Sequence, residues 1–177
     1  AGRETALFFS PKNIIGKNRE IAFCGPDTNM YNKLFLDKNP DIDFILKGEY
    51  EFTLLELAQA LGKKDRKKLS EIKGIFFRDE TNKPFYTGER ELIPNIDILP
   101  WPARHLIPMG KYNDTPGGIP CPSVQMWASR GCPFQCIFCS WPQIMYGNHS
   151  YRTRNPVDVV DEMEWLANWC FVRGQNL

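Results

Sequence analysis

Three cysteines on one short segment, Cys132, Cys136 and Cys139, have the clearest chemical potential in this sequence. Their C-x3-C-x2-C spacing lets the chain curl around a metal, and a positive metal centre makes three neighbouring thiolates tolerable. A structural zinc site usually takes four protein ligands, and an iron–sulfur cluster normally takes four cysteines. This segment supplies three, and a four-iron cluster held by three cysteines leaves one iron open to an outside ligand.

Two other uses of these cysteines stay open on the residues alone. A zinc site would need a fourth ligand from Cys121, His105 or His149, and none of the three lies at a paired C-x2-C or H-x3-H spacing. A disulfide with one spare thiol would need an oxidising compartment, and no signal-peptide pattern is visible. The sequence therefore favours an iron–sulfur cluster over zinc or a disulfide.

The same segment has Phe138 directly before its last cysteine, and this pattern closely resembles the signature of the radical S-adenosylmethionine (radical SAM) enzymes. In that family the open iron is chelated by the amino and carboxylate groups of S-adenosylmethionine, and the reduced cluster cleaves the sulfonium to a 5′-deoxyadenosyl radical. The resemblance implies that Cys132, Cys136 and Cys139 are the cluster ligands and that Phe138 lies beside the adenine. It assigns no catalytic side chain in this chain. It implies an external electron donor, such as flavodoxin or ferredoxin, as a partner.

The residues after the motif resemble one branch of that family. Ser140-Trp-Pro-Gln143 and the later Tyr151-Arg-Thr-Arg154 are similar to the anaerobic Mg-protoporphyrin ester cyclases and hopanoid-pathway enzymes. Arg152 or Arg154 could bind a substrate or S-adenosylmethionine carboxylate in bidentate geometry. A surface ion pair with the acidic helix that follows is the other interpretation.

The first third of the chain alternates strand and helix patterns. Apolar runs predict strands at 21–25 and 42–46, with helices through Lys38 and over 52–61. This order predicts a βαβ unit with parallel strands. The inward face of the second helix is predicted from the spacing of its apolar residues, which are Phe52, Leu55, Ala58 and Leu61, widened by Leu54 and Leu57.

The amino-acid sequence of that region also resembles a known domain. Cys24-Gly-Pro-Asp27, with the later Gly48-Glu-Tyr-Glu-Phe-Thr53, looks like the last part of a cobalamin-binding Rossmann-like domain that often precedes the radical SAM barrel. The resemblance implies cobalamin for a full-length parent enzyme. It does not extend cobalamin to this chain, because the loop that carries a cobalt-ligating histidine in some members would precede residue 1.

The middle of the chain predicts a connector. Residues 74–78 and 84–87 flank a turn and predict a small antiparallel hairpin, and the proline-rich stretch 93–102 is predicted to be extended, with Trp101 as a packing anchor.

In the last third of the chain, the apolar run 123–129 predicts a buried strand, and a helix is predicted from Pro156 with Asn155 as its cap. The apolar face of that helix is predicted from its spacing, with Val157, Val160, Met163, Leu166, Ala167 and Cys170.

The composition of the chain restricts the classes of partner and the compartment that we expect. The chain has 177 residues and a net charge of +1, so it lacks the basic footprint expected for nucleic-acid binding. No apolar run approaches the roughly 18 residues that suggest a membrane span. Cysteines without a secretory signal point to a reducing compartment, and we expect a cytoplasmic protein.

Together these patterns predict an α/β fold in three parts. We expect the C-terminal half of a cobalamin-binding Rossmann-like domain at 1–61, a linker with a small β-hairpin at 62–122, and the first βα unit of a radical SAM (β/α) barrel at 123–177. A full barrel needs roughly 200 residues or more, so we expect a weakly active piece of an enzyme.

The function implied by the resemblance is reductive cleavage of S-adenosylmethionine for methylation, cyclisation or rearrangement of an unactivated substrate carbon. The alternative from a different class is a zinc-stabilised, non-catalytic interaction module that uses the same cysteines.

Overall fold

The computed structural model describes residues 19–25, 28, 33–109, 123–134, 136–139 and 150–172. The chain divides into two compact units, one formed by Ala1–Leu92 with Gln135–Asn148 and the other by Ile93–Phe134 with His149–Leu177. The expectations for Cys121, His149 and the side chain of Cys170 fall outside the described residues.

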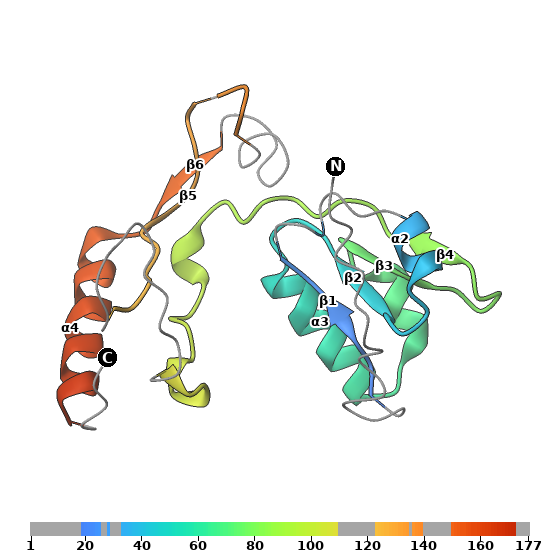
Figure 1. Ribbon diagram of the computed structural model, residues 1–177, viewed down its shortest axis with the longest axis horizontal. Helices are drawn as coiled ribbons and strands as arrows, with labels where there is room; N and C mark the ends of the chain where they lie inside the picture. Colours follow the sequence, from blue (N-terminus) through green and yellow to red (C-terminus); the bar gives the residue numbers. More distant parts are fainter. Residues whose placement is uncertain are drawn as a thin grey trace. The chain divides into compact units, whose positions relative to one another are not determined.

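The first unit is built on a four-stranded sheet with the order β1-β2-β3-β4 (Figure 1). The strands are β1 (Ala22–Phe23), β2 (Phe44–Leu46), β3 (Ile75–Arg78) and β4 (Pro84–Tyr86). β1 and β2 are parallel, whereas β3 is antiparallel to both β2 and β4. The parallel pair and the hairpin are both confirmed, and the unit is a mixed α/β structure.

The hairpin lies in the same sheet as the parallel pair, although the sequence pattern predicts it within a connector that begins at residue 62. Phe77 of β3 is the register partner of Phe44 of β2, and Ile75 is the partner of Leu46. These four side chains are all buried in one cluster. The hairpin joins the sheet because its alternate apolar residues extend the same core face.

Both faces of the sheet are covered. On one face Phe44 and Leu46 pack with Leu57 of α3 (Glu51–Gly62) and with Leu69 of η2 (Arg66–Glu71). On the other face a second buried cluster involves α2 (Lys33–Lys38), with Leu36, Ile42, Ile45 and Phe76 as its members. Successive residues of a strand point to opposite faces, so β2 is buried along its whole length.

The predicted inward face of α3 is right in part, because Leu57 and Leu61 pack in the core as expected, whereas Thr53 and Ala60 on the inward side were not predicted. Its buried residues are Thr53, Leu57 and Ala60, while Leu55 is 51% exposed. The Thr53 hydroxyl donates a hydrogen bond of 3.0 Å to the Lys73 carbonyl oxygen. Because the Thr53 hydroxyl has a hydrogen-bond partner, Thr53 can be buried, and its side of the helix faces the core. A count of apolar residues alone does not predict this orientation.

Arg78 fixes α2 against the sheet. Its guanidinium donates to the carbonyl oxygens of Ile42 at 2.7 Å, Leu36 at 2.5 Å and Asn39 at 3.2 Å. Carbonyls near a helix C-terminus lack intrahelical partners, and a cation there also complements the helix dipole. The helix ends before Asn39-Pro40, as the sequence predicts.

The second unit contains a two-stranded antiparallel sheet and a long helix. The strands are β5 (Ser129–Gly131) and β6 (Tyr151–Thr153), with Arg130 opposite Arg152, and the helix is α4 (Pro156–Val172). Two short turns of 3₁₀ helix, η3 (Ile96–Ile98) and η4 (Arg104–Leu106), precede them.

The strand predicted at 123–129 is wrong in position and in pairing. Residues 123–127 lie outside any strand, and β5 begins at Ser129 and pairs with β6, which the sequence analysis missed. β5 leads into the cysteine segment and β6 follows it, and the two strands pair antiparallel, with Gly131 opposite Tyr151. The start of α4 and its cap are confirmed, because Asn155 Oδ1 accepts a 2.9 Å hydrogen bond from the Val157 amide.

The predicted apolar face of α4 is also wrong for most of its length. Val157, Val160 and Met163 are 66%, 59% and 53% exposed, while Leu166 is buried. Glu162 is fully buried instead, for reasons of charge pairing given below. No helix among the described residues is both long enough and apolar enough to cross a membrane.

We expect Leu57→Ala to lower the free energy of unfolding of the first unit by about 2–5 kcal/mol, because Leu57 is almost fully buried. Leu55→Ala on the same helix is the control and should change it by no more than about 0.5 kcal/mol. Urea unfolding followed by circular dichroism measures both. Equal losses for the two variants would contradict the observed orientation of α3.

Candidate functional site: the cysteine segment and its base

The described cysteines are thiols, not disulfides. Cys132 and Cys139 are half-buried, and Cys136 is exposed, as is Cys24 in the first unit. Partial desolvation raises the pKa of the Cys24 thiol, and a hydrogen bond with Tyr50 opposes this shift. The three thiols of the motif are therefore chemically available as soft ligands.

Cys136 and Cys139 are the ends of one tight turn. The Cys139 amide donates a 3.0 Å hydrogen bond to the Cys136 carbonyl oxygen, and Ile137 and Phe138 form the turn between them. Such a bond brings the first and fourth Cα atoms within about 7 Å of each other. Two thiols on one turn are the local arrangement that a C-x2-C metal ligand pair requires.

The third thiol is described separately from this pair. Cys132 follows β5 in the second unit, whereas Cys136 and Cys139 are assigned to the first unit. Among the residues that the structure describes, no three His, Cys, Asp or Glu side chains are grouped closely enough to hold a metal ion. The structure thus brings together two of the three predicted ligands.

The side chains at the tip of the turn are exposed. Ile137 is 94% exposed and Phe138 is 89% exposed, and Phe134 nearby in sequence is 68% exposed. Exposed apolar side chains of this size are candidates for contact with a ligand or a partner.

Gly131, directly before Cys132, allows the backbone to approach Ser150 closely. Its φ of +85° lies in the left-handed region, and a Cβ built on it would lie 1.5 Å from the carbonyl oxygen of Ser150. Only glycine fits this position, because any side chain would overlap the backbone of the returning strand. The close approach of β5 and β6 directly before Cys132 therefore depends on Gly131.

We predict that Gly131→Ala lowers the stability of the second unit by more than about 2 kcal/mol, through left-handed strain together with the backbone overlap. Gly48→Ala is the matched control, since Gly48 has a φ of +69° but a Cβ at that position would meet no other atom within 4 Å. That variant should cost about 1–2 kcal/mol. Thermal unfolding measures both, and an undisturbed Gly131→Ala variant would contradict the observed geometry.

A buried charge cluster of Arg104, Arg154 and Glu162 lies between α4 and the residues next to β5 and β6. One oxygen of Glu162 accepts from Arg104 and the other from Arg154, each at 2.5 Å. The three residues are 0%, 5% and 5% exposed. Each carboxylate oxygen has its own guanidinium, which is the geometry in which a buried ion pair offsets its desolvation cost.

Arg154 uses all of its side-chain nitrogens within the second unit. Besides Glu162, it donates to Asp158 Oδ2 at 2.5 and 3.2 Å and to the Trp127 carbonyl oxygen at 3.0 Å. Burial alone would lower the pKa of Arg154, but the hydrogen bonds and charges of Asp158 and Glu162 outweigh it and raise that pKa. Arg154 therefore pairs with the acidic helix, as one of the two interpretations expects, but as a buried cation and not at the surface.

The proline-rich stretch is attached to the same cluster. The Trp101 indole donates a 3.0 Å hydrogen bond to Asp158 Oδ1, and its ring lies 6.1 Å from that of Trp165. Arg104 also donates to the Gln125 carbonyl oxygen at 3.1 Å. The prediction that Trp101 is a packing anchor is confirmed.

The hydrogen bond from Arg154 lowers the pKa of the Asp158 carboxyl below its ordinary value; burial opposes this shift and the Trp101 indole reinforces it. A lowered folded-state pKa means that Asp158 stabilises the fold above the unfolded pKa of about 4 and loses this effect as the pH falls further.

We therefore expect Asp158→Asn to flatten the fall in melting temperature of the second unit between about pH 5 and pH 2. Asp161→Asn, at an exposed position on the same helix, is the control and should keep the steep fall. Tryptophan fluorescence during heating measures the transition. An equally steep fall in the Asp158→Asn variant would show that this carboxylate does not drive it.

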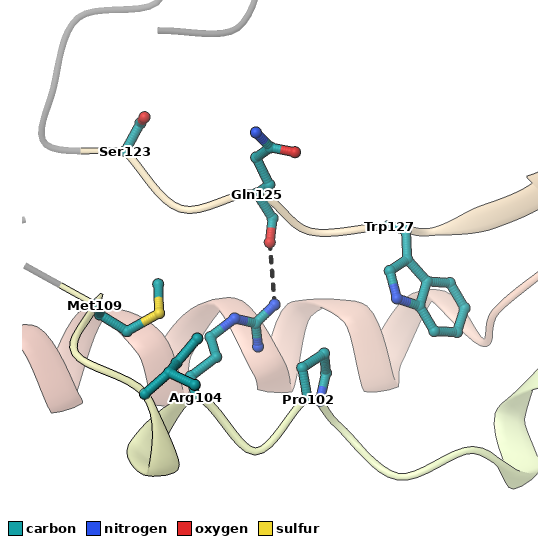
Figure 2. Close-up of a pocket in the computed structure, with 7 residues that line it drawn as sticks. Pro102, Arg104, Met109, Ser123, Gln125 and Trp127 are labelled. Carbon is teal, nitrogen blue, oxygen red and sulfur yellow. Dashed lines mark hydrogen bonds between the residues drawn. The ribbon is translucent and has the colours of Figure 1, made fainter. Parts of the chain in front are cut away.

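A cavity of about 320 Å³ lies beside this cluster. Figure 2 shows the segment with Ser123, Gln125 and Trp127 opposite the one with Pro102, Arg104 and Met109, joined by the hydrogen bond from Arg104 to the Gln125 carbonyl oxygen. The Trp127 ring also lies 4.5 Å from the Arg130 guanidinium and 5.1 Å from that of Arg154. The walls are largely apolar, and the charge of Arg104 is already neutralised by Glu162.

Sequence reasoning missed Arg104 and Glu162. Asp158 and Glu162 are spaced i, i+4 on one side of α4, and Arg154 precedes them by one further turn, so this part of the pattern was visible. Arg104 gave no signal, because its partner lies 58 residues away in the chain.

Comparison with known proteins places these features in context. No protein-family model matches the chain. It is 35% identical over 155 residues to an uncharacterized methyltransferase of Pyrococcus horikoshii, which covers 88% of this chain and 32% of the relative. It is 33% identical over 134 residues to the anaerobic magnesium-protoporphyrin IX monomethyl ester cyclase of Cereibacter sphaeroides, covering 75% of this chain and 21% of the relative. The chain thus spans about a third or less of the curated relatives it matches.

A solved structure has a similar fold. The radical S-adenosylmethionine methyltransferase TsrM from Kitasatospora setae matches with a TM-score of 0.59 at 20% identity, over 89% of this chain and 29% of TsrM. At this identity the match establishes the likeness of fold. The resemblance inferred from the cysteine motif is therefore confirmed: over most of its length the chain is a relative of methyltransferases and anaerobic ester cyclases, and it has the α/β fold of a radical S-adenosylmethionine methyltransferase.

Proposed function

We propose that this chain is part of a radical SAM enzyme and that Cys132, Cys136 and Cys139 bind a 4Fe–4S cluster. The observation that carries the proposal is the C-x3-C-x2-C motif, whose last two cysteines close a hydrogen-bonded turn. Relatives that are methyltransferases and ester cyclases support it, as does the fold shared with TsrM.

The chemistry of the donor set fits such a cluster. Thiolates are the usual ligands of iron–sulfur clusters, and the described thiols of the motif are not consumed by disulfides. When bound in reduced form with S-adenosylmethionine, a cluster of this kind supplies a 5′-deoxyadenosyl radical. The chain itself would provide the three thiolates and, at Phe138, an exposed aromatic face beside the adenine.

The names of the relatives support a reaction class for the full-length enzyme. We propose methylation, cyclisation or rearrangement at an unactivated carbon of a small-molecule substrate. One relative is named a hopanoid C-3 methylase of Methylococcus capsulatus, at 29% identity over 69% of this chain and 21% of that enzyme. A methyl transfer and a ring closure both fit these names, and the proposal covers both.

We further propose that the first unit contains the C-terminal half of a cobalamin-binding Rossmann-like domain. A second TsrM structure holds cobalamin and a [4Fe-4S] cluster and matches with a TM-score of 0.55 at 19% identity. In this chain Cys24-Gly25 and Gly48-Glu49 follow the carboxyl ends of the parallel strands β1 and β2, the edge at which open α/β sheets bind ligands. Cobalamin would belong to the full-length enzyme.

An external one-electron donor, such as flavodoxin or ferredoxin, would supply the reducing electron. The exposed turn residues Ile137 and Phe138 would be accessible to such a partner.

Anaerobic reconstitution of the full chain with iron and sulfide tests the proposal. The unmodified chain should take up about four irons and a matching amount of sulfide. Cys132→Ala, Cys136→Ala and Cys139→Ala should each lose the cluster, because two thiolates do not hold it firmly.

Cys24→Ala is the matched control, because it removes a thiol of the first unit that lies outside the motif. It should keep the full iron content. Stoichiometric zinc without sulfide in the unmodified chain would contradict the proposal and favour a zinc-stabilised interaction module.

A further inference from the structure

Arg154 holds together the two strands next to the cysteine segment, β5 before it and β6 after it. This residue directly follows β6, and its backbone amide donates a 2.8 Å hydrogen bond to the Ala128 carbonyl oxygen, just before β5. Its guanidinium binds the Trp127 carbonyl oxygen at 3.0 Å. The position of Arg154 therefore sets the register in which the two strands meet before Cys132.

Arg154 is in turn held by a fully buried carboxylate. Glu162 of α4 binds Arg154 through one oxygen and Arg104 through the other. Removing this charge would leave two guanidiniums buried close together, with the partial compensation of Asp158 on one of them. β5 and β6 would then separate, while the hydrogen bond that caps α4 at Asn155 would stay in place.

We propose that Glu162 is a positioning residue for the iron–sulfur site, an inference that rests on the proposed function. Through Arg154 it holds Trp127 and Ala128 directly before β5, so that the strand presents Cys132 for ligation at its other end, and through Arg104 it holds the segment around Gln125 that leads into that strand. Glu162 touches no ligand itself.

The chain offers a matched pair of variants for this inference. Glu162→Gln keeps the size of the side chain and removes its charge. Glu164→Gln makes the same change at an exposed position on the same helix. Glu162→Asp keeps the charge on a shorter side chain and should restore part of the effect.

The first measurement uses the metal-free, reduced chain and does not depend on the cluster. The rate of alkylation of each cysteine by iodoacetamide is followed by mass spectrometry. We expect Glu162→Gln to raise the rate at Cys132 by about tenfold or more, with Glu162→Asp intermediate, because loss of a buried ion-pair partner favours local opening. Cys24, in the first unit, and the Glu164→Gln variant should keep their rates.

The second measurement is iron and sulfide uptake at limiting iron, with the electron paramagnetic resonance spectrum of the reduced product. Glu162→Gln should take up several-fold less iron than Glu164→Gln and give a broadened spectrum, with Glu162→Asp between them.

Unchanged Cys132 alkylation in Glu162→Gln would overturn the inference, and so would a general loss of α4 helicity in circular dichroism, since Glu162 would then act only in folding. If the unmodified chain takes up no iron while the alkylation difference persists, the proposed function fails and the control of Cys132 by Glu162 remains.

Discussion

The second unit depends on one buried carboxylate. Glu162 lies between Arg104 and Arg154 with no exposure to solvent, and an unpaired charge in that position would be costly. Arg104 of η4 must therefore meet two segments far from it in the sequence, the end of β6 and the middle of α4. The fold of this unit is set by the requirement that these charges stay paired, more than by its modest apolar core.

This constraint has a consequence for the cysteine segment. The segment itself is exposed and carries large apolar side chains, so it gains little from packing. Its geometry is instead imposed at its ends, by Gly131 on one strand and by Arg154 after the other. A metal-binding segment supported in this way can keep its thiols near the surface, where a cluster, a nucleoside cofactor and an electron donor would all have access.

The sequence predicted the first unit better than the second. The parallel strands, the hairpin and the helix limits follow from local patterns of apolar residues and from Gly and Pro, which act over a few residues. The orientation of α3 could not be predicted, because it depends on a hydrogen bond from Thr53 to a distant carbonyl. The inward face of α4 failed for a related reason, since a charged residue is buried when its partners come from elsewhere in the chain. The cysteine motif could be recognised because ligand spacing is local, and its role as a ligand set stays a prediction.

The central claim is that three thiolates hold a cluster with one iron left open. The most direct test is electron paramagnetic resonance of the reconstituted, reduced chain with and without S-adenosylmethionine. An open iron should bind the amino and carboxylate groups of S-adenosylmethionine, so the account predicts a clear change in the g values on addition, and none with S-adenosylmethionine lacking its amino group. A cluster spectrum that is the same with and without S-adenosylmethionine would show that no iron is open and would contradict the account.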